Sequence, residues 1–244
     1  MDIAITKVPL AQLGDMRAKF LTIIDNQFTY DKCHLAGWAD TWSFKVDGAV
    51  AGYGSVWGKD KREDRDSIFE FYLEPAYRKD AHEIFGKFID ASEATWIESQ
   101  SNDPLLSDVF FEFAIDIYAE AILFEDDFDS TIQINGAKLE PIQTPESHRL
   151  NKEYALKYHN EVVGKGGLML NYNFPYADIY YGVEEPYRRK GFGSFFVQEL
   201  KREAYRIGRV PAARTNISNM ISKRTMMKAG LKPCGWRLGG KIKK

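Results

Sequence analysis

A short pattern that occurs twice constrains the fold of this chain of 244 residues more than any other feature. Between Trp42 and Trp57 aromatic and β-branched residues alternate with small and polar ones, and the run breaks at Asp47-Gly48, a strong signal for a two-residue hairpin turn. The same shape returns over residues 154–170 and breaks at His159-Asn160. At an offset of 112, four residues recur in identical form: Lys45, Val50, Gly52 and Gly54 correspond to Lys157, Val162, Gly164 and Gly166.

A second block of matches follows the first in the same order. At an offset of 110, Glu74, Tyr77, Arg78 and Phe85 correspond to Glu184, Tyr187, Arg188 and Phe195. A change of two residues in the offset is what an insertion or deletion in a loop produces. We therefore interpret the chain as two copies of a unit of about 110 residues, and expect domains over residues 1–130 and 131–244. We also expect the first copy to complete the sheet of the second or to wall its cleft.

Hydrophobic periodicity indicates the same order of elements in each copy: hairpin, strand, helix, strand, helix, strand. The predicted strands include residues 3–8, 68–73, 117–124, 179–183 and 209–215. Apolar residues at helical spacing predict helices over 82–89, 105–113, 195–204 and 217–229. Asp103-Pro104 has the N-cap and first-turn chemistry of a helix start, and Gly230 stands where helices commonly stop. The predicted fold class is α/β (α+β), with a mixed, mostly antiparallel sheet flanked by helices in each copy.

Composition excludes some classes of function. A net charge of -2 argues against a general nucleic-acid or anionic-membrane binder. No apolar run approaches the roughly 18 residues of a membrane span, and no leader pattern opens the sequence, so we expect a cytoplasmic protein. Cys33 and Cys234 lack metal-ligand spacing, so we expect neither a disulfide framework nor a metal site. Cys33-His34 is either a metal fragment that needs further ligands or a buried thiol beside a solvated histidine.

The segment most informative about function begins where a predicted strand ends at Val183. A turn follows, and Gly191 and Gly193 arrive just as a helix begins. Glycine lets backbone N–H groups approach an anion, and a helix N-terminus presents N–H groups without intrahelical partners. Cationic side chains accompany the glycines at Arg188, Arg189 and Lys190. The combination suits a pyrophosphate, although a basic glycine-containing turn without a ligand has the same composition.

This segment resembles the R/Q-x-x-G-x-G/A pyrophosphate motif of the GNAT superfamily of N-acetyltransferases, with Arg188, Gly191 and Gly193 at its defined positions. A second family signature is similar to a stretch further on, where Leu replaces the usual Phe. Its positions are filled by Asn219, Ser222, Lys228, Gly230 and Leu231. Together the motifs cover residues 177–232. The resemblance implies two GNAT-like repeats and an acetyl-CoA-dependent transfer of an acetyl group to an amine of a small molecule or peptide.

The resemblance also implies roles for particular residues. Backbone groups near Val183 would contact the pantetheine arm of CoA. The pyrophosphate would be held by Arg188, Arg189, Lys190, Gly191, Phe192, Gly193 and Ser194. Asn219 would hydrogen-bond the arm, and Ser222 would lie near the phosphates. The alternatives are an Asn that caps its own helix and a solvated Ser.

The first copy has a corresponding loop, but it lacks the two glycines that suit a pyrophosphate. Ala81 and Glu83 stand where the second copy has Gly191 and Gly193, and Asp80 adds another carboxylate. Side chains there block a close approach, and carboxylates repel a diphosphate. We therefore expect that the first copy does not bind CoA; the alternative is a shifted loop that still binds it.

The catalytic residues are less well defined by the sequence. Asp178 is the candidate general base, and the alternative is a carboxylate that merely opens a strand. The position at which other members carry a carboxylate is Arg214 here, and the position of the usual thiolate-protonating tyrosine is Met226. Tyr180, Tyr181 or a water could serve instead.

Two other functional classes remain open. One is a CoA-binding or structural module without turnover. The other, a Rossmann-type nucleotide binder, is disfavoured because no G-x-G-x-x-G follows an early strand. The tyrosines at 172, 176, 180 and 181, with Phe174, either line an acceptor cleft between the two copies or pack beneath helices.

Overall fold

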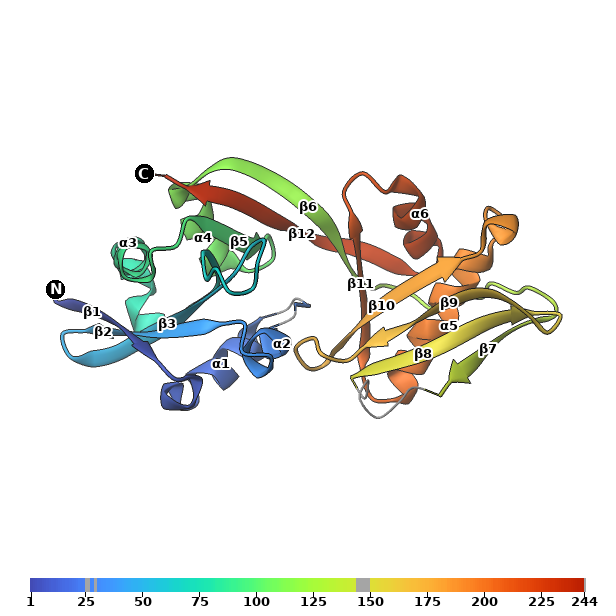
Figure 1. The fold of residues 1–244 in the computed structure, drawn as a ribbon, viewed down its shortest axis with the longest axis horizontal. Helices are drawn as coiled ribbons and strands as arrows, with labels where there is room; N and C mark the ends of the chain where they lie inside the picture. The colour runs from blue at the N-terminus through green and yellow to red at the C-terminus, as the bar shows by residue number, and fades with distance from the viewer. Residues whose placement is uncertain (25–26, 29, 144–149, 244) are drawn as a thin grey trace. The chain divides into compact units, whose positions relative to one another are not determined.

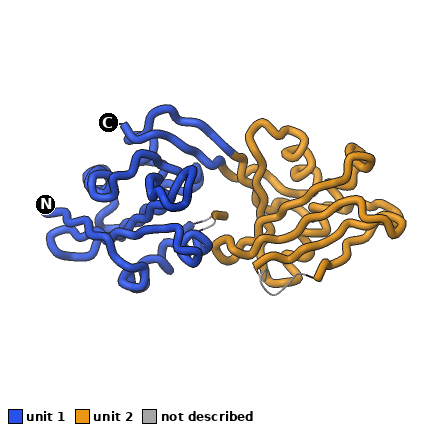
Figure 2. The backbone as a smooth tube through the Cα atoms, in the orientation of Figure 1, with its two compact units in different colours: residues 1–26, 30–120, 236–244 blue, residues 27–29, 121–235 orange. Residues whose placement is uncertain are grey.

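The computed structural model describes residues 1–24, 27–28, 30–143 and 150–243. The chain forms two compact units (Figure 2). The first comprises Met1–Asn26, Tyr30–Glu120 and Trp236–Lys244, and the second comprises Gln27–Thr29 and Ala121–Gly235. The two units therefore exchange short segments of chain, which a single boundary at 130/131 does not describe.

Both copies of the repeat fold with the predicted order of elements (Figure 1). The first contains β1 (Ile3–Val8), β2 (Asp40–Val46), β3 (Ala49–Trp57), β4 (Ser67–Leu73), α3 (Ala81–Ser92), β5 (Trp96–Gln100), α4 (Pro104–Phe113) and β6 (Ala114–Asp126). The second contains β7 (Ala137–Ile142), β8 (Asn151–Tyr158), β9 (Glu161–Met169), β10 (Tyr176–Val183), α5 (Phe192–Arg206), β11 (Val210–Asn216), α6 (Met220–Lys228) and β12 (Leu231–Ile242). The first copy has two additional helices after β1, α1 (Met16–Ile23) and α2 (Tyr30–Leu35).

The hairpins have the same geometry in both copies. Asp47 and Gly48 have φ of 48° and 82°, and His159 and Asn160 have φ of 47° and 70°. Positive φ at both central residues is the signature of a type I′ turn, whose twist matches that of the flanking strands. The register of β2–β3 shifts between Phe44 and Lys45, and that of β8–β9 shifts between Leu156 and Lys157. The equivalence seen in the sequence thus extends to a backbone irregularity.

The last strand of each copy completes the sheet of the other compact unit. In the first unit β1 to β5 are followed by the end of β12, which pairs antiparallel with β5 from Arg237 to Lys241. In the second unit β7 to β11 are followed by the end of β6, which pairs antiparallel with β11 from Ala121 to Glu125. Only β4–β5 and β10–β11 are parallel pairs among the strand pairs described. The mixed α/β fold is as predicted. Of the two alternatives for the first copy, completion of the second unit's sheet is the one observed, and the reciprocal pairing of β12 with β5 was not predicted.

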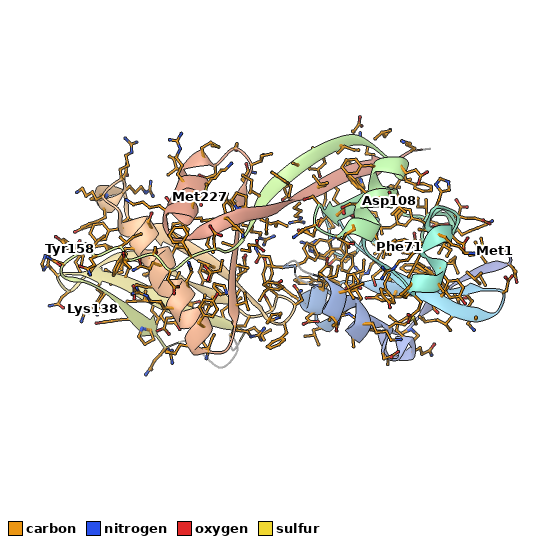
Figure 3. The ribbon with its side chains drawn as sticks, turned by 180° about the vertical axis from the view of Figure 1, so that it is seen from behind. Met1, Phe71, Asp108, Lys138, Tyr158 and Met227 are labelled. Carbon is orange, nitrogen blue, oxygen red and sulfur yellow. The ribbon has the colours of Figure 1, made fainter. Side chains whose placement is uncertain are left out.

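Helices cover both faces of the first unit's sheet. On one face, Phe85 and Phe88 of α3 and Phe110 of α4 pack with Phe71 of β4, which is labelled in Figure 3. On the other face, Phe20 of α1 packs edge-on against Tyr53 and Tyr72. Each fully buried ring of this kind contributes roughly 1.5–3 kcal/mol of hydrophobic stabilisation, so this unit has a sizeable core of its own.

One face of the second unit's sheet is covered by α5 and α6. The predicted apolar stripe of α5 is confirmed, with Phe196 and Leu200 fully buried beside Ile179 of β10 and Met226 of α6. Gly230 follows α6 with φ of 89°, a left-handed conformation that suits the predicted glycine stop. These contacts fix the angle at which α5 meets the end of β10.

His34 is not the solvated histidine that the sequence suggested. Its side chain is 5% exposed, and its Nε2 lies 2.9 Å from Oε2 of the buried Glu70, which also accepts a hydrogen bond from Ser55 Oγ. Cys33 is fully buried, as the alternative to a metal fragment proposed. No group of three or more potential metal-binding side chains occurs in the described part of the chain. None of its helices is long and apolar enough to cross a bilayer.

Candidate functional site

The glycine-containing loop between β10 and α5 adopts an unusual backbone. After the short 3-10 helix Glu185–Tyr187, Arg189 has φ of 61° and Gly191 has φ of 90°. Arg188, just before them, is extended. Left-handed residues in such a turn direct neighbouring N–H groups toward one side of the backbone, an arrangement that binds anions. A Cβ on Gly191 would find only Ile134 Cδ1, at 3.9 Å, so the space beside it is open.

The second half of this loop presents backbone N–H groups that lack an acceptor in the described part of the chain. Among the described residues, no oxygen accepts a hydrogen bond from the backbone N–H groups of residues 189–194. Gly191 is the N-cap of α5 and supplies no side-chain cap. The N-terminus of α5 therefore presents donors and the positive end of its dipole to the loop, as expected of a pyrophosphate site.

Some side chains of the loop pack into the protein, and others are exposed to solvent. Phe192 is 4% exposed and packs edge-on against Tyr158, labelled in Figure 3, so it offers a ligand its backbone only. Ser194 is buried and donates to the carbonyl of Thr225. Arg188 is anchored to the end of β10, because its Nε donates to Val183 O at 2.9 Å. Arg189 and Lys190 remain exposed, and the Lys190 ammonium lies 5.8 Å from the centre of the Tyr187 ring.

Strands β10 and β11 part just before the loop. Their parallel pairing runs from Tyr176–Val210 to Ile179–Ala213 and then ends, while β10 continues to Val183 against β9. A strand advances about 3.3 Å per residue, so the gap extends roughly 13 Å from Ile179 to Val183. A narrow extended group that enters at the loop and follows β10 would reach the point where the strands meet.

Helix α6 forms the other side of this gap. Asn219 caps its own helix, since its Oδ1 accepts from Ser222 N at 3.0 Å, and its amide NH₂ makes no hydrogen bond with the described residues. Ser222 Oγ lies 3.1 Å from the Tyr181 hydroxyl, so Ser222 is not simply solvated. A Cβ on Gly193 would lie 3.1 Å from Thr225 Cγ2, which leaves little room for a larger residue between α5 and α6.

Asp178 lies at the closed end of the gap, paired in register with Ala212. It is 2% exposed, and burial raises its pKa to about 7 although nearby Arg214, Tyr172 and Gln27 each lower it. Its Oδ1 is buried and has no hydrogen-bond partner among the described residues. A carboxyl group that is close to half-protonated near neutral pH has the proton affinity required of a general base.

The second half of the chain is similar in sequence to a known protein family. Residues 117–231 match the model of the acetyltransferase (GNAT) family. This part of the chain belongs to the GNAT acetyltransferases. No curated protein matches the sequence, and the solved structures that resemble it do so at low identity and therefore inform on the fold alone.

Several of those structures are GNAT proteins. An acetyltransferase from the GNAT family of Colwellia psychrerythraea is 13% identical, with 98% of this chain and 100% of that chain covered at a TM-score of 0.75. A tandem GNAT protein from the clavulanic acid biosynthesis pathway is 11% identical, with 100% and 99% covered at a TM-score of 0.64. A GCN5-related N-acetyltransferase from Sphaerobacter thermophilus is 13% identical, with 84% and 81% covered at a TM-score of 0.55. The whole chain thus has a tandem GNAT fold.

The corresponding loop of the first copy has a different backbone. Ala81, at the position of Gly191, has φ of -54°, and its N–H donates to Arg78 O. Arg78 still reaches the end of its strand, with Nε 3.4 Å from Leu73 O, as Arg188 does in the GNAT domain. The hydrogen bond from the arginine side chain to the end of the preceding strand is thus present in both copies. The first copy lacks the open N–H group at the position of Gly191, because Ala81 N–H is already bonded. That the first copy does not bind CoA stays a prediction, which this backbone favours.

Sequence reasoning missed one residue of this site. Gln27 is 3% exposed, its Nε2 donates to Ala213 O at 2.5 Å, and it lies against Asp178. Its neighbour Phe28 is held by Asn173, which accepts from Phe28 N at 2.7 Å and donates to Phe28 O at 3.0 Å. No local pattern marks Gln27, because its role depends on contacts with residues that are far away in the sequence.

Proposed function

We propose that this protein transfers an acetyl group from acetyl-CoA to an amine of a small molecule or peptide. The observation that carries the proposal is the row of backbone N–H groups at residues 189–194, which have no acceptor among the described residues and open onto free space beside Gly191. A diphosphate needs such donors together with positive charge, and Arg189 and Lys190 supply the latter. The donor set therefore fits the pyrophosphate of CoA.

The gap between β10 and β11 suits the rest of the acyl donor. We infer that the pantetheine arm lies along β10 between Val183 and Ile179, within reach of the Asn219 amide. Acetyl-CoA supplies the activated thioester, and its carbonyl would then lie near Asp178. Holding the thioester beside an amine replaces a bimolecular encounter by an oriented one, which is a large part of the catalysis available to such a site.

Asp178 is the proposed general base. An alkyl ammonium with a pKa near 10 is not a nucleophile, so a proton must leave before the nitrogen can attack. In the balanced reaction the N–C bond forms, the C–S bond breaks, CoA leaves as a thiol, and one proton is released from the ammonium. The Oδ1 of Asp178, which lacks a donor, is suited to accept that proton. Because Asp178 is buried, Tyr172 or Gln27 must shift as the amine enters.

Tyr181 is the proposed acid for the departing thiolate. It follows Ile179 by two residues on β10, and its hydroxyl lies 3.1 Å from Ser222 Oγ at the side of the gap. Burial raises the pKa of Tyr181, so its hydroxyl retains its proton at neutral pH and can donate it. This group supplies the function that Met226, buried at the position of the family's usual tyrosine, lacks.

The competing function is a module that binds CoA without turnover. The deep burial of Asp178 is the observation that favours it. The two are separated by following free CoA thiol when the protein is given acetyl-CoA and a panel of amines, with the signal from Cys234 subtracted. Thiol release that depends on both the amine and Asp178 supports the enzyme. Tight CoA binding with no release over the whole panel refutes turnover and leaves the binding module.

A further inference from the structure

Arg214 stands beside Asp178 at the closed end of the gap. It follows Ala213, the last residue of β11 that pairs with β10. Ala212 is the partner of Asp178, and side chains two apart on a strand point to the same face, so Asp178 and Arg214 share a face. Ile179 and Ala213 point to the opposite face, where they are buried in the core with α5 and α6.

The guanidinium of Arg214 has N–H donors that are available to a ligand. It makes no hydrogen bond with any residue that the structure describes, and the nearest anionic contact, from Nε to Asp178 Oδ2, is 3.8 Å. Its side chain is 33% exposed, whereas that of Asp178 is 3% exposed. The group is nevertheless held in place, because it lies 5.5 Å from the centre of the buried Tyr172 ring. A stacked guanidinium keeps its planar fork of N–H groups directed sideways.

A structural ion pair in the same chain looks different. Arg237 engages Glu98 through two bonds, Nε to Oε1 at 2.9 Å and Nη2 to Oε2 at 2.7 Å. Short, paired bonds are the favoured geometry for a guanidinium whose partner is a carboxylate of the protein. Arg214 sits one residue from the end of the strand pairing with its fork unoccupied, although a carboxylate lies within 4 Å. The N–H groups of Arg214 are therefore available to bind another anion.

We propose that Arg214 binds a carboxylate of the acceptor, so that the acceptor is an amine that also carries a carboxylate close by, with an α-amino acid as the simplest form. The inference rests on the proposed acyl transfer. The amine would face the carboxylate of Asp178 while the acceptor's carboxylate takes the fork of Arg214, so the charges of the site complement those of a zwitterion. Arg214 then selects the acceptor, and Asp178 activates it.

The test uses matched pairs of acceptors that differ only at the carboxylate. Amino acids, including β-alanine and 4-aminobutyrate, are compared with their primary amides in the thiol-release assay. A charge-assisted hydrogen bond contributes about 1.5–3 kcal/mol, which predicts a preference of about 10- to 100-fold in kcat/KM for the carboxylate form. R214Q should abolish this preference through a rise in KM for the amino acid. Loss of Arg214 also raises the pKa of Asp178 and so affects both forms, which makes the ratio of the two kcat/KM values the readout. R214K keeps the charge but loses the fork, and should restore the preference only in part.

Two controls keep the outcomes separate. Arg209 lies just before β11 with its guanidinium over Phe174 rather than near Asp178, so R209Q should retain the preference. CoA binding measured by calorimetry shows whether R214Q still folds around the cofactor loop. Amides used as well as amino acids, a preference that survives R214Q, or CoA binding without turnover of either form would each overturn the assignment. Absence of CoA binding in the wild type would instead overturn the proposed acyl transfer.

Discussion

Replacing Asp178 by Asn should stabilise the second unit more at high pH than at low pH. Burial raises the pKa of Asp178 from 3.8 to about 7, so the folded state holds a proton that the unfolded chain releases. Such a group contributes its full stability below pH 4 and loses it as the pH rises through 7. With 1.36 kcal/mol for each pKa unit, the advantage of D178N over the wild type should grow by about 3 kcal/mol between pH 5 and pH 8.

The measurement is urea unfolding of both proteins at the two pH values. All five tryptophans, residues 38, 42, 57, 96 and 236, belong to the first unit, so their fluorescence follows that unit while far-UV circular dichroism follows both. D178N should change the circular dichroism transition and leave the fluorescence transition largely in place. An advantage that is the same at pH 5 and pH 8 would refute the argument, because it would mean that Asp178 ionises equally easily in the folded and unfolded states.

Asp103 provides a matched control for the same experiment. It is also buried, burial raises its pKa to about 7, and it caps α4 by accepting from Leu106 N at 3.2 Å. D103N should show the same pH trend in tryptophan fluorescence, because Asn preserves the cap. Only D178N should lower kcat/KM, by about 10²- to 10⁴-fold, and remove a limb of its pH profile near 7. A loss of activity of equal size in D103N would contradict a specific role for Asp178.

Two further predictions concern the packing that holds α5 and α6. Lys201 is 4% exposed on its side chain, pairs with Asp126 and donates to the carbonyls of Phe128, Ala229 and Gly230. K201M should lower the free energy of unfolding by about 3 kcal/mol, since it leaves the partly buried Asp126 carboxylate without its cation and the Phe128 carbonyl without a donor among the described residues; a urea midpoint within error of the wild type would refute this. G230A should destabilise by at least about 2 kcal/mol, because φ of 89° is unfavourable for alanine and its Cβ would lie 2.0 Å from Phe128 O; an unchanged melting temperature would contradict it.

The repeat, the turns and most elements were predictable because their signals are local. Asp47-Gly48 and His159-Asn160 encode their turns directly, and the apolar stripe of α5 faces the core that its spacing predicts. The completion of one unit's sheet by the last strand of the other copy was anticipated only in one direction. The reciprocal pairing of β12 with β5 depends on which partner a strand finds, and alternation alone does not specify a partner.

The site was predictable to the extent that backbone conformation follows from residue type. Glycine at 191 permitted the left-handed turn that leaves the N–H groups open. The anchoring of Arg188 on Val183 O, the capping by Asn219 and the cover of Gln27 over Asp178 were beyond reach, since side-chain contacts are settled by packing between distant segments. In the sequence Arg214 was only a departure from the family pattern. Its position beside Asp178, known from the structure, is what suggests a role in binding the acceptor.

The measurement that tests the central claim most directly is calorimetric titration of CoA into the wild type and G193E. The space beside Gly193 is limited by Thr225 and Tyr181, and a glutamate there would also bring a negative charge to the row of N–H groups. We predict that the wild type binds CoA, that G193E does not, and that the charge-matched control G86E binds as the wild type does, because Gly86 lies in α3 of the first unit and an added Cβ there would come no closer than 3.7 Å to Phe113. Wild-type protein that gives no binding heat at millimolar CoA, or equal affinity in G193E, would contradict the account.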